Sequence, residues 1–156
     1  MRIGNLLVVC VGNICRSPMA EVLLRHELQG KTSTSVASAG LGALAGHAAS
    51  EHAVALMAER GLDLSGHRAR QLTPELVHGS DLVLVMERRH KKALDSMEPA
   101  ARGKVYRLCE WRDEDVPDPW GHQREAYESA LLQIEQGVAD WVERIVASAA
   151  NTANIQ

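Results

Sequence analysis

Short apolar stretches alternate with longer amphipathic ones along the whole chain, as strands and helices do in an α/β domain. Two runs, at 6–11 and 82–86, are apolar without interruption, which is typical of parallel strands covered on both faces. The stretches expected to form strands are 4–11, 32–37, 82–86 and 105–108. We therefore expect a parallel sheet with helices on both sides.

Helical periodicity fills the intervals between these strands. Ser17 is a good N-cap and Pro18 a good first residue for a helix that ends near residue 28. We expect further helices over about 48–60, after a capping Thr73, over 87–97 and after Gly121. The last of them carries an apolar stripe typical of core packing, made of Tyr127, Leu131, Ile134, Val138, Trp141 and Ile145.

The bulk composition indicates one globular domain over residues 1–150, followed by a tail, 151–156, that we expect to fray. The net charge of −3 gives no general attraction for nucleic acid or for a membrane surface. The apolar run at 6–11 is too short for a transmembrane helix, and no convincing small-residue cleavage site follows it, so we interpret it as a buried strand rather than part of a signal peptide. Three cysteines without a disulfide pattern favour the reducing cytoplasm. A monomer is the default expectation.

The most informative pattern lies where the first predicted strand meets the first predicted helix. Cys10 ends the strand, Arg16 follows six residues later, and Ser17 opens the helix. Free N–H groups and the positive end of the helix dipole bind anions at such a junction. Gly12 and Asn13 accept positive φ, which turns N–H groups inward. The sequence therefore predicts an anion-binding loop, without the Gly-Lys-Ser/Thr of a nucleotide P-loop.

A thiol and a guanidinium in one anion-binding loop point to phosphoryl transfer through cysteine. A helix N-terminus and a nearby cation favour the nucleophilic thiolate of Cys10. Arg16 could hold two phosphoryl oxygens with its planar fork, and Ser17 could donate its hydroxyl to the sulfur. The alternative is that Cys10 is a small buried residue at the end of a strand. The cysteine–arginine spacing alone does not separate the two, but the surrounding turn favours the nucleophile.

The acidic stretch 113–118 supplies candidates for the acid that protonates the leaving oxygen. Asp118 lies between two prolines, which make a rigid loop that can present one carboxyl group. Trp120 follows and could line a pocket for a flat group. The three acidic residues at 113–115 lack this frame, and we expect them to form a solvated face. The alternative for Asp118 is a plain turn-forming Asp-Pro pair.

The segment Cys10-Val-Gly-Asn-Ile-Cys-Arg-Ser17, with a late Asp118-Pro119, resembles the low-molecular-weight protein tyrosine phosphatases. The resemblance covers nearly the whole chain, and it is greatest to the bacterial type associated with exopolysaccharide and capsule export. It implies a three-layer α/β fold with a four-stranded parallel sheet in flavodoxin-like order and a phosphate loop after the first strand. Further matching segments are Ser38-Ala-Gly40, His67-Arg-Ala-Arg-Gln71 and Asp81-Leu-Val-Leu-Val-Met86.

The resemblance also implies roles for single residues. Cys10 would be the nucleophile, Arg16 the phosphate clamp and Asp118 the general acid that later activates water against a phosphocysteine. Cys15 could form a disulfide with Cys10 and protect it from over-oxidation. The phosphate-binding loop would comprise Val11, Gly12, Asn13, Ile14 and Cys15.

The resemblance further implies which residues surround this loop. The walls for the phenyl ring would be Ile14, Leu44 and Trp120. Asn13 would hold the shape of the loop by bonding Ser38 and His67, although His67 without the family pattern is an ordinary loop histidine.

The implied activity is hydrolysis of phosphotyrosine in a protein, without cofactor or metal. The implied partner is an autophosphorylated bacterial tyrosine kinase of exopolysaccharide synthesis or export. The seven histidines show no zinc-type spacing with thiols or carboxylates, which agrees with metal-free chemistry.

The chain departs from the eukaryotic members in two places. Those members carry an aromatic residue where 41–44 is aliphatic here, and tandem tyrosines where Trp120-Gly121 follows Asp118-Pro119. Recognition of the ring should therefore be looser or depend more on Trp120, and regulation through those tyrosines is absent.

Three alternatives stay open. An arsenate reductase on the same scaffold needs a further cysteine pair, and only Cys109 lies outside the loop. A protein arginine phosphatase carries Thr where this chain has Ile14, and a branched apolar wall suits a phenyl ring better. A phosphotyrosine-binding module without turnover would not need nucleophile, clamp and acid together.

Overall fold

The computed structural model describes the backbone of residues 2–155 and the side chains of residues 2–150. Its four strands form one fully parallel sheet in the order β2-β1-β3-β4, which confirms the predicted flavodoxin-like arrangement. The second strand begins three residues later than predicted and ends at Gly40, where it pairs with Cys10. The strands are β1 (Asn5–Cys10), β2 (Ser35–Gly40), β3 (Leu82–Val85) and β4 (Val105–Arg107).

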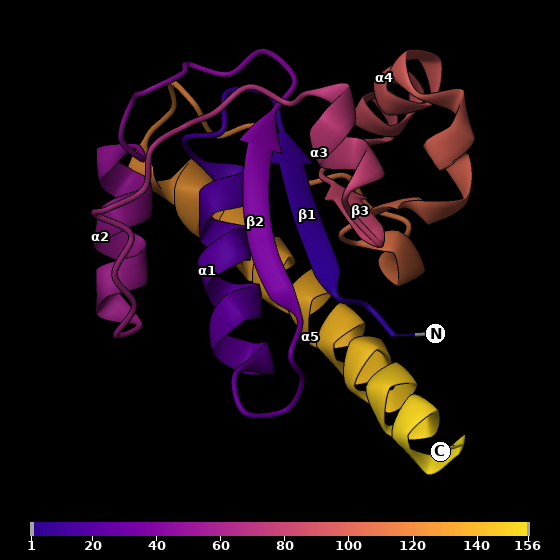
Figure 1. Cartoon of the computed structure of the whole chain (residues 1–156). Helices are drawn as coiled ribbons and strands as arrows, with labels where there is room; N and C mark the ends of the chain where they lie inside the picture. Colours follow the sequence, from indigo (N-terminus) through magenta and orange to yellow (C-terminus); the bar gives the residue numbers. More distant parts are fainter. Residues whose placement is uncertain (1, 156) are drawn as a thin grey trace.

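Helices cover both faces of the sheet, as predicted (Figure 1). On one face lie α1 (Arg16–Leu28) and α5 (Arg124–Ile155), with α2 (Glu51–Glu59) beside them. On the other lie α3 (Pro74–His78), α4 (Arg88–Met97) and the 3-10 helix η1 (Pro99–Lys104). A second 3-10 helix, η2 (Glu110–Arg112), follows β4. The backbone of α5 is helical through Ile155, and fraying of 151–156 stays a prediction.

The uninterrupted apolar run in β1 results from burial on both faces. Leu6, Val8 and Cys10 point into the core beneath α1 and α5, whereas Leu7 and Val9 point into the core beneath α3 and α4. A central parallel strand has no solvated face, so no polar alternation appears in its sequence. This packing fixes the place at which β1 ends and delivers Cys10 to the carboxyl edge of the sheet.

The first turn of α1 differs from the prediction. Cys15, not Ser17, is the N-cap residue, and no side chain caps the helix. The predicted N-cap at Ser17 is therefore wrong, because its hydroxyl bonds inside the preceding loop instead. An uncapped helix start leaves its N–H groups available to an anion. Thr73 does cap α3, as expected, by accepting from the Leu76 N–H at 3.3 Å.

Within the part of the chain that the structure describes, no helix combines the length and the apolar character that a membrane crossing requires.

Candidate active site

The loop that joins β1 to α1 turns its carbonyl groups away from its own centre. Among the described residues, none supplies an acceptor for the backbone N–H groups of residues 12–15. Five consecutive carbonyls, from Cys10 to Ile14, accept hydrogen bonds from Leu41 N, Gly42 N, Leu44 N, His67 Nε2 and Ser50 N, at 2.7–3.1 Å. The loop therefore offers a row of free N–H donors beside a helix N-terminus, which is the arrangement of an anion nest.

Asn13 gives the loop its turn. Its φ of +59° lies in the left-handed region, whereas Gly12 does not adopt a positive φ, so the expectation for Gly12 is wrong. The Asn13 side chain is fully buried and satisfied. Its Nδ2 donates to Ser17 Oγ at 2.8 Å and to Ser38 Oγ at 2.9 Å, and its Oδ1 accepts from Arg70 N at 3.0 Å. These bonds balance the cost of the left-handed conformation.

Cys10 and Ser17 face each other across the loop. The Cys10 Sγ lies 2.9 Å from Ser17 Oγ, and Cys10 is only 2% exposed. Ser17 Oγ already accepts from Asn13, so its own hydrogen is free to point toward the sulfur. A thiolate at Cys10 would therefore receive a hydrogen bond from Ser17.

The guanidinium of Arg16 is 1% exposed, and its two edges have different surroundings. Its Nη1 donates to Glu87 Oε2 at 2.5 Å and to the Val116 carbonyl at 2.8 Å. Its Nη2 lies 3.8 Å from Asp118 Oδ2, and its buried Nε has no partner among the described residues. A buried donor without a partner is costly. The edge formed by Nε and Nη2 is therefore suited to bind two oxygens of a phosphoryl group.

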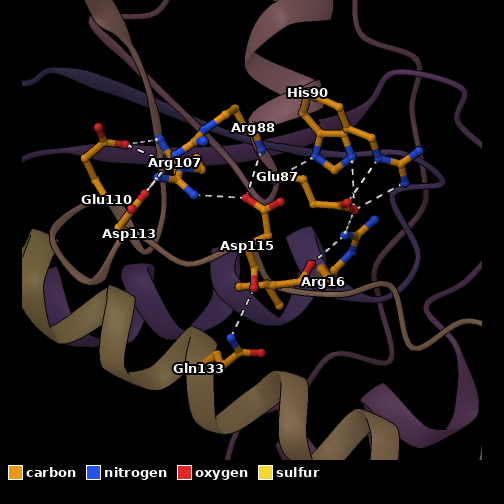
Figure 2. A network of polar contacts seen from close by, with 11 residues as sticks. Arg16, Glu87, Arg88, His90, Arg107, Glu110, Asp113, Asp115 and Gln133 are labelled. Atoms are coloured by element: carbon orange, nitrogen blue, oxygen red, sulfur yellow. Dashed lines mark hydrogen bonds and ion pairs between the residues drawn. The ribbon is translucent and has the colours of Figure 1, made fainter.

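Glu87 is a site residue that the sequence reasoning missed. It is the N-cap of α4, two residues after the end of β3, and its carboxylate accepts from both Arg16 and Arg89 (Figure 2). Burial opposes ionisation of this carboxyl, but the bonds from Arg89 and Arg16 outweigh it and lower the pKa of Glu87. The available signal was an acidic residue directly after an apolar strand, at the same sheet edge as Cys10.

His90 supports Glu87 from one turn further along α4. Its Nδ1 accepts from the Glu87 N–H at 3.1 Å, and the ring is almost fully buried. Burial, followed by the charge of Arg16, lowers the pKa of His90 to about 4, although Glu87 acts in the opposite direction. The imidazole is therefore neutral at physiological pH and adds no charge beside the guanidinium.

Asp118 lies at the mouth of the site, with its side chain 41% exposed. Its Oδ1 accepts from the Trp120 N–H at 3.1 Å, which closes a local turn and leaves the other carboxylate oxygen toward Arg16.

The neighbouring carboxylates of Asp113 and Asp115 are exposed, as expected, but each also accepts a hydrogen bond from the protein. Both accept from the buried Arg107 of β4, at 3.0 Å for Asp115 Oδ1 (Figure 2). The Asp115 carbonyl also accepts from Gln133 of α5 at 3.1 Å. The segment before Asp118 is thereby fixed to the sheet and to α5.

A cavity of about 200 Å³ opens above Cys10 and unites the residues that the sequence singled out. Its volume is below the usual range for drug-sized ligands, which fits a site for one ring and one phosphate. Trp120 is 56% exposed at its rim. The cavity is lined by Cys10, Val11, Gly12, Ile14, Cys15, Arg16, Gly42, Leu44, Asp118 and Trp120. Gly42 was not predicted, whereas Ser17, Ser38 and His67 lie behind the loop.

Cys15 is a free thiol on the inner side of the loop. Its Sγ lies 3.4 Å from both Ser50 Oγ and Tyr127 Oη, and burial raises its pKa. The third cysteine, Cys109, is buried elsewhere, where its Sγ donates to the Gln133 carbonyl at 3.3 Å, and burial raises its pKa to about 11.

No group of three or more histidine, cysteine or carboxylate side chains that could hold a metal ion occurs in the described part of the chain.

Comparison with known proteins identifies the class that this fold and loop define. The sequence model of the family described as "Low molecular weight phosphotyrosine protein phosphatase" matches residues 5–151. The chain belongs to this family. It is thus an enzyme, a hydrolase of the protein-tyrosine-phosphatase class.

Individual relatives agree with this membership. The chain is 51% identical over 145 residues to the "Probable low molecular weight protein-tyrosine-phosphatase EpsP" of Ralstonia nicotianae, covering 93% of this chain and 98% of that protein. It resembles the crystal structure of the tyrosine phosphatase Wzb from Escherichia coli K30 in complex with sulphate, with a TM-score of 0.86, 40% identity and coverage of 92% and 99%.

The scaffold is shared with an enzyme of another specificity. The YwlE arginine phosphatase from Geobacillus stearothermophilus aligns with a TM-score of 0.88 at 32% identity, covering 95% of this chain and 96% of that one. The fold alone therefore does not determine the substrate, which depends on the residues that line the cavity.

Proposed function

We propose that the protein hydrolyses phosphotyrosine in a protein substrate through a phosphocysteine intermediate at Cys10. The observation that carries this proposal is the geometry of one loop. Cys10 and Arg16 line the same cavity, and so do three of the loop residues whose N–H groups have no acceptor among the described residues, Gly12, Ile14 and Cys15.

In the first step, the Cys10 thiolate attacks phosphorus and forms the S–P bond. The P–O bond to the tyrosine breaks, and Asp118 gives its proton to the leaving phenolate oxygen. The loop N–H groups and the Nε and Nη2 of Arg16 stabilise the negative charge on the three remaining oxygens. Ser17 donates its hydroxyl to the thiolate sulfur.

In the second step, the Asp118 carboxylate takes a proton from water. The resulting hydroxide attacks phosphorus, the S–P bond breaks, and Cys10 leaves as a thiolate while inorganic phosphate is released. One carboxyl group at the cavity mouth suffices for both steps, since it ends the first step deprotonated.

The walls of the cavity support a phenyl ring rather than a guanidinium as the leaving group. Ile14, Leu44 and Trp120 contribute apolar or aromatic surface around the entrance. A phosphorylated arginine carries several N–H donors, which would stay without acceptors against such walls. This disfavours arginine phosphatase activity despite the shared scaffold.

The physiological substrate we propose is an autophosphorylated tyrosine kinase of exopolysaccharide synthesis or export, acting with this protein in the cytoplasm. The support is the likeness to EpsP of Ralstonia and to Wzb of Escherichia coli. We also propose that catalysis needs no metal and that Ser38 and His67 keep the loop in shape.

The test is a comparison of steady-state hydrolysis of phosphotyrosine, phosphoserine and phosphoarginine peptides, with and without EDTA. We expect clear preference for phosphotyrosine and no effect of EDTA. Preference for phosphoarginine would overturn the substrate, and hydrolysis of none of the three would overturn the activity. Loss of activity in EDTA would overturn the metal-free mechanism.

A further inference from the structure

A second cavity, of about 420 Å³, lies behind the phosphate loop. It is bordered by α1, by the end of β2 and by the segment 63–70, and it shares no lining residue with the cavity above Cys10. Its polar lining consists of Glu21, Arg25, Ser38, Asp63, His67, Arg68 and Arg70. Its volume lies within the usual range for small-molecule sites.

The two carboxylates in this cavity are already engaged with protein donors. Glu21 accepts from the Ser38 hydroxyl and from Arg25. Asp63 accepts from the N–H and the hydroxyl of Ser65, at 2.9 Å and 2.6 Å, and these two bonds lower the pKa of Asp63. Neither carboxylate is therefore well placed to bind an incoming cation.

The three arginines, in contrast, have guanidinium N–H groups that donate to none of the described residues. Each uses a single nitrogen for its contacts with the protein: Nη2 of Arg25, Nη1 of Arg68 and Nε of Arg70. Within the described residues, the remaining guanidinium nitrogens have no acceptor. The cavity thus holds three positive charges against two negative ones, with an excess of free N–H groups. This combination favours an anion.

We propose that this cavity is a second anion site, which binds a small molecule carrying a diphosphate group. Guanidinium groups pair with phosphate oxygens through two parallel hydrogen bonds. Arg25 approaches from α1, whereas Arg68 and Arg70 belong to the segment after α2. Donors from two sides of one cavity match two linked phosphoryl groups better than one.

This cavity adjoins side chains that hold the catalytic loop in its shape. Ser38 links the two, since its hydroxyl donates to Glu21 and accepts from Asn13. His67 lines the cavity and bonds the Asn13 carbonyl at 2.7 Å. A ligand in the cavity would therefore contact the side chains that hold Asn13.

The experiment is an NMR titration of isotope-labelled wild-type protein with inorganic pyrophosphate, and in parallel with ADP. Two sets of signals are followed: the side-chain Nε–H groups of Arg25, Arg68 and Arg70, and the backbone amides of residues 12–15. We expect the arginine signals to shift with a saturation curve of their own, distinct from that of the loop. If the arginine signals reach their midpoint at a lower concentration of ADP than of pyrophosphate, the ligand is of the nucleotide type. Equal midpoints would indicate a site for the diphosphate alone. Both results support the site.

A variant tests which residue is responsible. Arg68→Gln removes a guanidinium that contacts only backbone carbonyls of its own segment, so the fold should be kept. We expect its pyrophosphate midpoint at the cavity to rise by about tenfold or more. The matched control is Arg112→Gln, which removes a surface arginine paired with Asp140 outside this cavity.

Two results would overturn the proposal. One is the absence of a saturable shift at the three arginines at pyrophosphate concentrations that saturate the loop amides. The other is equal weakening in Arg68→Gln and Arg112→Gln, because that would indicate a general charge effect and no built site. Neither result bears on turnover at Cys10, which is measured separately.

Discussion

The two edges of the Arg16 guanidinium are used differently. Nη1 is held by Glu87 and by the Val116 carbonyl, whereas on the other edge Nη2 lies 3.8 Å from Asp118 Oδ2 and Nε has no partner among the described residues. The fork is thus oriented before any substrate arrives, which lowers the reorganisation needed in the transition state.

This orientation predicts a measurable role for Glu87. Glu87→Gln keeps the shape of the side chain but removes its charge, and we expect kcat/KM to fall by about tenfold or more. Inhibition by inorganic phosphate should weaken in parallel. The Glu87→Asp variant, which keeps the charge, should retain part of the kcat/KM and part of the phosphate inhibition. The control is Glu135→Gln, which breaks a surface pair with Arg60. Unchanged phosphate inhibition in Glu87→Gln would show that Glu87 does not position Arg16.

The proposed acid, Asp118, predicts a dependence on the leaving group. In Asp118→Asn, hydrolysis of phenyl phosphate should slow by about 10²–10⁴-fold, because the leaving oxygen is no longer protonated. Departure of p-nitrophenolate should suffer much less, since that group leaves well without a proton. Stopped-flow measurement of both substrates gives the comparison, and equal losses would mean that Asp118 has a structural role instead.

The two loop cysteines predict reversible inactivation by mild peroxide. Peroxide converts Cys10 to a sulfenic acid; the Cys15 thiol then displaces water and forms the disulfide. Mass spectrometry should find the Cys10–Cys15 link and its loss after a reducing agent. Cys15→Ser should not regain activity after treatment with the reducing agent, whereas Cys109→Ser should regain it. Sulfonic acid at Cys10 in the wild-type protein would refute the protective role.

Some of these residues were predictable and others were not. Cys10, Arg16 and Ser17 lie within one short segment, so their association follows from local spacing and from the strand-to-helix junction. Glu87 and Val116 come from segments 71 and 100 positions away from Arg16. The apolar strand before Glu87 could have marked it as a residue at the same sheet edge as Cys10, but no local pattern in the sequence reports the contacts of Glu87 and Val116 with Arg16.

At the scale of elements, the site depends on how closely β2 approaches the loop. Gly40 ends β2 opposite Cys10, and a Cβ added to it would clash with the Val11 carbonyl oxygen. That carbonyl also accepts from the Gly42 N–H at 3.0 Å. The backbones of β2 and the loop therefore fit together only without a side chain at this position.

Gly40→Ala should consequently destabilise the protein by about 1–3 kcal/mol, since the loop must move to admit the methyl group. Denaturant unfolding gives the loss, and phosphate affinity should fall as well. Gly42→Ala is the matched control, because its added Cβ would meet only Val11 Cγ1 at 3.9 Å. Equal stability of the two variants would contradict the close approach.

Element boundaries were harder to predict than element types. Serine usually caps helices, so the sequence predicts an N-cap at Ser17, but the hydroxyl of Ser17 bonds Cys10 and Asn13 instead. The carboxylates of Asp113 and Asp115 are exposed, as predicted, but their pairing with Arg107 was not predictable, because Arg107 is not adjacent to them on any helix face. In both places a tertiary contact decides what the local pattern does not report.

At the scale of the whole molecule, one polar network connects the active site to the sheet and to the helices around it. It runs from Arg16 through Glu87 to α4, and from Val116 through Asp115 to Arg107 and α5 (Figure 2). His90 belongs to this network, and it is buried in the neutral form.

This burial predicts how stability depends on pH. The pKa of His90 is lowered from 6.5 to about 4, so the unfolded chain binds a proton in this window that the folded protein does not. The contribution of the buried, neutral His90 to the free energy of unfolding should be complete above pH 6.5. It should fall as the pH drops toward 4. The contribution of this group is at most about 1.4 kcal/mol per pH unit.

A pair of variants isolates this contribution. His90→Asn keeps an acceptor for the Glu87 N–H but cannot titrate, so urea unfolding between pH 6.5 and 4 should show a smaller slope. The exposed His122→Asn should keep the wild-type slope. Identical slopes in all three proteins would contradict the assignment to His90.

The central claim is that Cys10 carries the phosphoryl group during turnover. The most direct measurement is a rapid-quench experiment on Asp118→Asn with p-nitrophenyl phosphate, followed by phosphorus NMR and peptide mass spectrometry. Because the base for the second step is missing, we predict that a phosphoryl group accumulates on Cys10 after a burst of p-nitrophenol. A burst without a phosphorylated Cys10, or a phosphoryl group on another residue, would contradict the mechanism.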